Sequence, residues 1–319
     1  MKSLKPIFAL VLIATIVPEL LTGSTPLSGF FNPVLFGILL IAYGIAVLVI
    51  REIAVRKNMN VSGILLLGFA YGILNEGLFS KTITLKDTLP IPQYSNYGTI
   101  LEMNLPWFAE IGLWHAVCSV LFPILAVHLL FPGESERPWL PKRLTVFFAV
   151  VVLFVGSMFF LNDSKVIGTP ARLFIFLFGI FIFVMLARSF GKKIPAPNLP
   201  KSASLKPVWL GLSSFFFFLI LTTIAKQRLS LFLFFAIYIF GIWFYHYLIK
   251  KKQWISQKNI FLFAIGVYMQ TTLLGAVFAA SLPETFFERV VVGILAEFIF
   301  IWIAIRIVTK SNVIVSQKF

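Results

Sequence analysis

The sequence predicts an all-α, polytopic integral membrane protein with about ten transmembrane helices and both termini in the cytoplasm. Of its 319 residues, 59% are hydrophobic and only 12% are charged, whereas a soluble domain carries roughly 25% charged residues. Apolar runs long enough to cross a bilayer recur along the whole chain, because a membrane helix needs about 20 such residues. The basic residues gather in alternate loops between these runs.

The predicted membrane helices follow one another with short connections. We expect them at residues 6–22, 33–54, 61–80, 105–131, 143–161, 170–188, 207–225, 230–249, 259–282 and 290–308. The first run follows a basic amino-terminal stretch as a signal peptide would, but it lacks an A-x-A cleavage site, so we expect a retained helix.

One connection is rich in Pro, Lys and Ser, which is typical of a flexible linker. It predicts three parts: a membrane domain over residues 1–188 with the first six helices and the polar site, a cytoplasmic linker over 189–206, and a membrane domain over 207–319 with the last four helices.

The basic residues indicate the orientation. With the amino terminus inside, most of the 27 Lys and Arg residues fall on the cytoplasmic side, which the positive-inside rule favours only for an even number of spans. The same placement accounts for the net charge of +15 without a nucleic-acid partner, because no basic surface stands apart from the membrane segments. We therefore expect a multi-pass protein of the cell membrane with lipids as its neighbours.

Ionisable residues inside the spans are the candidates for function. Glu76 lies on the third span, Glu110 and His115 on the fourth and Glu297 on the tenth, while Glu19 lies at the end of the first. The orientation places all of them in the outer half of the bilayer. A carboxylate there costs several kcal/mol unless it is protonated, paired or metal-bound. Structural hydrogen bonding, a proton-coupled path and a divalent cation site with His115 are three alternatives.

Spacing along the third span orients Glu76 toward protein. Gly68, Gly72 and Glu76 recur every four residues, so they form a small-xxx-small stripe that lets another helix approach closely. On the fourth span, Glu110 and His115 are five residues apart, or about 140° around a straight helix. They therefore cannot bind one ion from the same face.

Other residue types limit the chemistry. His115 aligns with Cys118 and Ser119 in a small polar seam. Because Cys118 is the single cysteine, an intramolecular disulfide and a multi-cysteine metal site are both excluded. Phosphate-binding loops, G-x-S-x-G and H-E-x-x-H are absent from the sequence, so the usual nucleotide and hydrolase signatures are missing.

The stretch Tyr71-Gly72-Ile73-Leu74-Asn75-Glu76-Gly77-Leu78, followed by His115 on the next span, resembles the CAAX-protease and bacteriocin-processing family of intramembrane proteases. Asn75 stands where that family carries the first Glu of a Glu-Glu pair. The resemblance covers the third and fourth spans. It implies a glutamate-activated water, with Glu76 as base or metal-side carboxylate and His115 as its partner.

Three functional hypotheses follow. The first is an intramembrane hydrolase that depends on glutamate or on a metal, with Glu76, His115 and Glu110 as catalytic residues. Asn75, Glu297 and Glu19 are additional polar-site residues in this hypothesis, and its cofactor is unknown, with a divalent metal ion as the one candidate. The second is a transporter coupled to protons or cations, and the third is a non-catalytic membrane scaffold. The substrate, a peptide or a small molecule, is not specified by the sequence.

Overall fold

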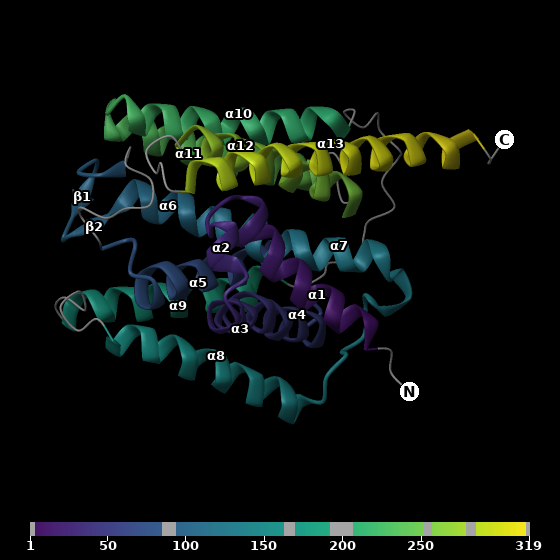
Figure 1. Ribbon diagram of the computed structural model, residues 1–319, viewed down its shortest axis with the longest axis horizontal. Coiled ribbons are helices and arrows are strands. Elements are labelled where there is room, and N and C mark those ends of the chain that lie inside the picture. The colour runs from purple at the N-terminus through teal and green to yellow at the C-terminus, as the bar shows by residue number, and fades with distance from the viewer. Residues whose placement is uncertain are drawn as a thin grey trace.

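A computed structural model describes residues 4–84, 94–162, 170–191, 207–251, 257–278 and 285–316. Within these ranges the chain forms a layered bundle of helices (Figure 1). Helices α10 to α13 form one outer layer, α8 lies on the opposite side, and the other helices lie between them.

The α-helices are α1 (Lys5–Ile16), α2 (Leu27–Phe30), α3 (Pro33–Leu39), α4 (Ala46–Arg56), α5 (Val61–Ile73), α6 (Leu105–Trp114), α7 (Phe122–Leu130), α8 (Lys142–Asn162), α9 (Pro170–Phe190), α10 (Pro207–Lys226), α11 (Leu231–Lys251), α12 (Gln257–Phe278) and α13 (Phe286–Ser316). Four π-helical segments continue or join them: η1 (Val17–Leu21), η2 (Leu40–Ile45), η3 (Leu74–Phe79) and η5 (His115–Leu121). A 3₁₀ turn, η6 (Pro132–Glu134), follows α7.

Several of these helices are long and apolar enough to cross a membrane. In the described part of the chain, seven meet that standard: Pro33–Arg56, Val61–Phe79, Leu105–Leu130, Lys142–Phe159, Pro170–Phe190, Val208–Lys226 and Leu231–Leu248. Each coincides with a predicted span to within a few residues. The remaining three predicted spans are also helical, as α1 with η1, as α12 and as α13. The predicted multi-pass helical architecture is confirmed.

Contacts near the helix ends show that α5 runs opposite to α6 and α9. At one end of the bundle, the backbone N–H of Asn60 donates to the Gly191 carbonyl at 2.6 Å. At the other end, Arg172 pairs with Glu102. The amino end of α1 and the carboxyl end of α13 lie at the same end of the bundle (Figure 1).

Asparagine side chains begin three of the helical spans. Asn32 accepts hydrogen bonds from the backbone N–H groups of Val34 and Leu35, and Asn60 and Asn104 cap α5 and α6 in the same way. Such caps satisfy donors that a helix leaves unpaired at its start.

A short hairpin departs from the all-α prediction. Strands β1 (Thr99–Ile100) and β2 (Met103–Asn104) pair antiparallel. Leu101 and Glu102 turn between them with φ of 50° and 60°, the left-handed conformation that two-residue hairpin turns require. Two-residue strands carry too little alternation for a sequence pattern to reveal them.

The glycine stripe of α5 packs as predicted. A Cβ atom at Gly68 would lie 2.7 Å from the Cα of Ala116, and one at Gly72 would lie 3.0 Å from the Cα of Gly112. Backbone therefore meets backbone between α5 and the segment α6–η5. This close approach brings Glu76, one turn beyond Gly72, against His115.

Both predicted membrane domains contribute to one hydrophobic core. The rings of Phe122 on α7 and Phe261 on α12 stack at 4.5 Å, and the Tyr268 hydroxyl donates to the Cys118 carbonyl at 2.8 Å. Residues 192–206 of the predicted linker lie outside the described residues.

Candidate functional site

Glu76 and His115 are in direct contact inside the bundle. Glu76 Oε1 and His115 Nε2 are 2.9 Å apart, and the two residues are 8% and 1% exposed. They belong to η3 and η5, which follow α5 and α6 in the chain. Two residues 39 positions apart in the sequence therefore form one buried pair.

The polar residues of this region lie on π-helical turns. Glu19 belongs to η1, Tyr43 to η2, Glu76 to η3 and His115 to η5. A π-turn holds one more residue than an α-turn, and it is rare and frequent at functional sites. Because η1 and α5 both pack against η5, and α1 against η2, these wider turns meet in one part of the bundle.

The Glu76 carboxylate has hydrogen-bond donors on both oxygens. Asn75 Nδ2 lies 3.3 Å from Oε1, Ser80 Oγ lies 3.0 Å from Oε2, and the Thr82 hydroxyl also donates to Oε2. Together with His115 these groups match the acceptor capacity of a carboxylate.

His115 is held at both ring nitrogens. Its Nδ1 lies 2.9 Å from Ser119 Oγ, one turn along the same segment. An ionised carboxylate only accepts, so Nε2–H donates to Glu76, and in the neutral imidazole Nδ1 then accepts from the Ser119 hydroxyl. The ring stacks on Tyr43 at 6.0 Å and meets Tyr71 edge-on. These contacts leave His115 a single orientation.

A second carboxylate joins the pair through side chains. Glu19 accepts a hydrogen bond from Thr25 Oγ1 at 2.5 Å, and the Tyr43 hydroxyl lies beside its carboxylate. Asn75 Nδ2 donates to that hydroxyl at 3.3 Å as well as to Glu76. The chain Glu19–Tyr43–Asn75–Glu76 thus connects three spans. We call Glu19, Tyr43, Asn75, Glu76, His115 and Ser119 the central polar cluster.

Glu110 makes its contacts elsewhere, contrary to its predicted catalytic role beside Glu76. It accepts from the Tyr94 hydroxyl and, at 3.1 Å, from Thr222 Oγ1 on α10. The physical reason is the angle of about 140° between Glu110 and His115, which directs the two side chains to different neighbouring helices.

Glu297 is likewise a partner of another helix, because it accepts a hydrogen bond from Thr272 of α12. None of its contacts within the described residues reaches the central polar cluster. Of the additional polar-site residues expected from the sequence, the structure brings Asn75 and Glu19 to Glu76 and leaves Glu297 apart.

The cluster does not fit a metal ion. Among the described residues, no group of three or more His, Cys, Asp and Glu side chains is arranged to hold one. Both nitrogens of His115 are already engaged, by Glu76 and by Ser119. The residues present therefore favour acid–base chemistry over Lewis-acid chemistry.

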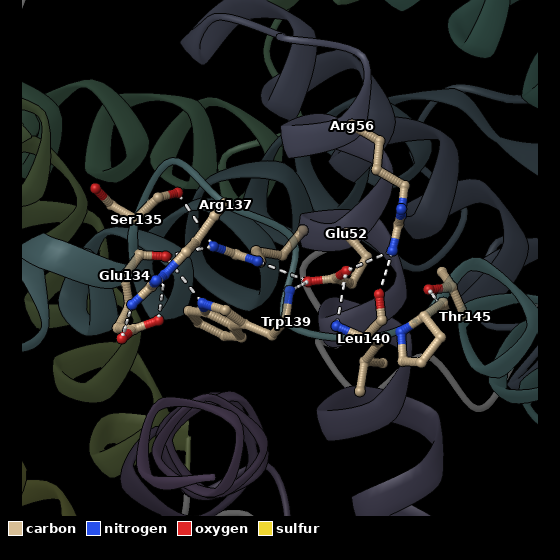
Figure 2. Close-up of polar contacts among 10 residues, drawn as sticks. Glu52, Arg56, Glu134, Ser135, Arg137, Trp139, Leu140 and Thr145 are labelled. Atoms are coloured by element: carbon tan, nitrogen blue, oxygen red, sulfur yellow. Dashed lines mark hydrogen bonds and ion pairs between the residues drawn. The ribbon is translucent and has the colours of Figure 1, made fainter. Parts of the chain in front are cut away.

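A second buried network lies at the end of α4. Glu52 pairs with Arg56, one turn further along the helix, at 3.3 Å. It also accepts hydrogen bonds from the backbone N–H groups of Trp139 at 2.9 Å and Leu140 at 3.2 Å (Figure 2). Arg51 bonds to Glu52 at 2.6 Å and stacks on Trp139. These hydrogen bonds hold the loop after α7 against α4. None of these bonds involves His115.

Tyr43, Thr82 and Ser80 are site residues that sequence reasoning did not select. Tyr43 lies in an apolar span, and Ser80 and Thr82 lie just beyond the end of another. Tyr43 reaches the Glu19 carboxylate through packing between two spans, whereas Thr82 turns back to Glu76 from six residues further along the chain. No spacing signal in the sequence distinguishes them.

The fold and the cluster together define a class: a multi-pass helical membrane protein with a buried carboxylate–histidine site. A family model described as an uncharacterized membrane protein family matches residues 8–319, so the chain belongs to that family. No curated protein and no solved structure matches the chain.

Proposed function

We propose that this protein is an intramembrane hydrolase in which Glu76 and His115 perform the acid–base chemistry. The observation that carries the proposal is their 2.9 Å contact inside a buried polar cluster. A histidine oriented by a carboxylate is the usual means of moving a proton to and from a reacting group. The resemblance to intramembrane CAAX and bacteriocin-processing proteases, carried by Asn75-Glu76 and His115, supports the same reaction class.

The substrate in this proposal is an amide or ester within the membrane, on a peptide or a small molecule. His115 takes the proton of the attacking group, Glu76 stabilises the resulting imidazolium, and His115 then protonates the leaving group. About ten spans with both termini cytoplasmic would set the site in the outer half of the cell membrane. No step in this mechanism needs a metal ion.

The test compares membranes from cells that produce wild-type protein, Glu76→Gln, or the control Glu102→Gln. Glu102 is a suitable control because its side chain is half exposed and pairs with Arg172. New peptide termini and lipid products would be measured by mass spectrometry. We expect products with wild type and Glu102→Gln, and a loss of roughly 10²-fold or more with Glu76→Gln, the scale of general acid–base catalysis. Equal amounts of product with wild type and Glu76→Gln would contradict the proposal. A wild-type sample with neither new peptide termini nor lipid products would contradict it too.

Proton-coupled transport is the second candidate, and the Glu19–Tyr43–Asn75–Glu76 chain is the observation that favours it. Two buried carboxylates with Tyr43 and Asn75 between them, on three spans, offer a path for a proton. Proteoliposomes with an internal pH dye and a potassium-diffusion potential would test it. Transport predicts proton entry with wild type and its loss with Glu76→Gln, whereas equal entry with both would exclude this candidate.

A further inference from the structure

We propose that Ser119 is the nucleophile of this site, so that the reaction passes through an acyl-enzyme intermediate. The inference deepens the proposed hydrolase function and rests on it. Ser119 Oγ lies 2.9 Å from His115 Nδ1, and His115 Nε2 lies 2.9 Å from Glu76 Oε1. Hydroxyl, imidazole and carboxylate thus follow one another in hydrogen-bond contact.

The same order of groups defines the serine, histidine and acid triads of soluble hydrolases, which recur on unrelated folds and are recognised by geometry. Here the roles of the two ring nitrogens are the reverse of those in the soluble triads: Nδ1 faces the hydroxyl and Nε2 faces the acid. Either nitrogen of a neutral imidazole serves as base when the other carries the proton. Glu76 selects that tautomer by accepting from Nε2.

Ser119 differs from the other hydroxyl residues of the membrane helices. Most of those hydroxyls donate to a backbone carbonyl three or four residues earlier, which is the ordinary structural bond of a Ser or Thr in a helix. Members of that set are Thr15, Thr22, Ser157, Ser213, Ser214, Thr222, Thr223, Thr271 and Thr272. The Ser119 hydroxyl bonds instead to the imidazole of His115.

The π-helical turn η5 contains both partners. It begins at His115 and extends to Leu121, so its backbone bonds run from i to i+5 and its turns are wider than those of an α-helix. The His115 ring, which bonds to the Ser119 hydroxyl, is held in place by ring contacts with Tyr43 and Tyr71. A preorganised pair of this kind is what nucleophile activation requires.

The reaction uses these three side chains and one water molecule. Ser119 Oγ attacks the acyl carbon while its proton passes to His115 Nδ1, and Glu76 faces the imidazolium that forms. The bond to the amine or alcohol breaks, and His115 returns the proton to that leaving group. Water then cleaves the acyl ester, which frees Ser119 and a carboxylic acid. Because Ser119 has no exposed surface, the substrate reaches it only when neighbouring helices separate.

A fluorophosphonate probe tests the nucleophile without knowledge of the substrate. Attack by Ser119 on phosphorus forms an O–P bond, breaks the P–F bond and releases hydrogen fluoride overall. The full-length protein in detergent would be treated and the modified residue identified by mass spectrometry. We expect labelling at Ser119, none in Ser119→Ala, and labelling slower by roughly 10²-fold or more in His115→Ala and Glu76→Gln.

Ser214→Ala is the matched control, because Ser214 is a buried hydroxyl that bonds to the carbonyls of Gly211 and Phe263. It should label as the wild type does. Folding of each variant would be checked with a thiol-reactive dye during heating, since the single cysteine, Cys118, is fully buried and reacts only when the bundle opens. A folded wild-type protein that gains no label at Ser119 would overturn the inference.

Two results separate this inference from the function on which it rests. If Ser119→Ala retains the Glu76-dependent products in membranes, the nucleophile is not Ser119 while the hydrolase survives. If Glu76→Gln leaves those products unchanged, the hydrolase itself fails.

Discussion

Tyr43 shows how one hydroxyl organises the central polar cluster. It lies beside the Glu19 carboxylate, accepts a hydrogen bond from Asn75 and stacks on the His115 ring. A buried polar group that loses its hydrogen-bond partner lowers the stability of the fold by about 1–3 kcal/mol. The Tyr43 hydroxyl faces polar groups of both Glu19 and Asn75. Its removal therefore affects residues on two other spans.

We expect Tyr43→Phe to lower the free energy of unfolding by about 1–3 kcal/mol because it removes the buried hydroxyl that accepts from Asn75 Nδ2 and lies beside the Glu19 carboxylate. Thermal unfolding followed through Cys118 reactivity would measure the change. Tyr97→Phe is the matched control, since the buried Tyr97 hydroxyl has no hydrogen-bond partner in the described part of the chain. Equal melting temperatures for both variants would contradict the role given to Tyr43.

The Glu134–Arg137 pair lies outside the membrane spans and should respond to pH. The hydrogen bonds from Arg137 lower the pKa of the Glu134 carboxyl below its usual value. A lowered carboxyl pKa stabilises the folded loop above the unfolded pKa, and this stability is lost as pH falls through the folded pKa. We expect acidification to increase hydrogen exchange at residues 132–137, and Arg137→Gln to remove most of that response. Equal responses in both proteins would exclude the pair as the cause.

At the scale of elements, the contact between α5 and the segment α6–η5 determines whether the site exists. Gly68 and Gly72 let the backbones approach, and the same approach brings η3 and η5 together. Membrane helices associate through such close packing because lipid offers no hydrophobic drive between them.

We expect Gly68→Ala to destabilise the protein by about 1–3 kcal/mol, the scale of overpacking a tight core. Its new Cβ would lie 2.7 Å from the Ala116 backbone, so α5 and η5 must separate. Gly37→Ala is the control, since nothing in the described structure lies within 4 Å of a Cβ there. Thermal unfolding of the two variants gives the comparison, and equal stability would argue against the stripe as the contact that builds the site.

At the scale of the whole molecule, orientation in the membrane decides from which side the central polar cluster is approached. The contacts of the loops place Asn60 at one end of the bundle and Glu102 at the other. The excess of Lys and Arg at the first of these ends makes it the cytoplasmic one in our proposal.

Single-cysteine variants test this orientation. Lys57→Cys should react with a membrane-impermeant maleimide only after cells are opened, and Thr99→Cys should react in intact cells. Both positions are exposed, and the native protein is a silent background because Cys118 is buried. The reverse pattern would place the cluster in the inner half of the bilayer, and labelling of both in intact cells would contradict the alternation of the spans.

Composition and residue spacing were enough to predict a membrane protein, its helical spans, and the glycine stripe by which Glu76 faces a neighbouring helix rather than lipid. Hydropathy and an α-helical period are local properties, so residues read in order are enough to predict them. The same regularity correctly separated Glu110 from His115 by angle, although Glu110 was still expected to serve the site.

Only the tertiary structure decided which polar groups meet. In the structure, Glu76 contacts His115, and Glu19 and Tyr43 lie in the same cluster. Glu110 instead accepts hydrogen bonds from Tyr94 and Thr222. Glu297 accepts one from Thr272. For Glu76 and His115 the physical reason includes the π-helical turns on which they lie, because such turns depart from the α-helical period. Which side chains then come within hydrogen-bond distance depends on the packing of helices distant in the chain.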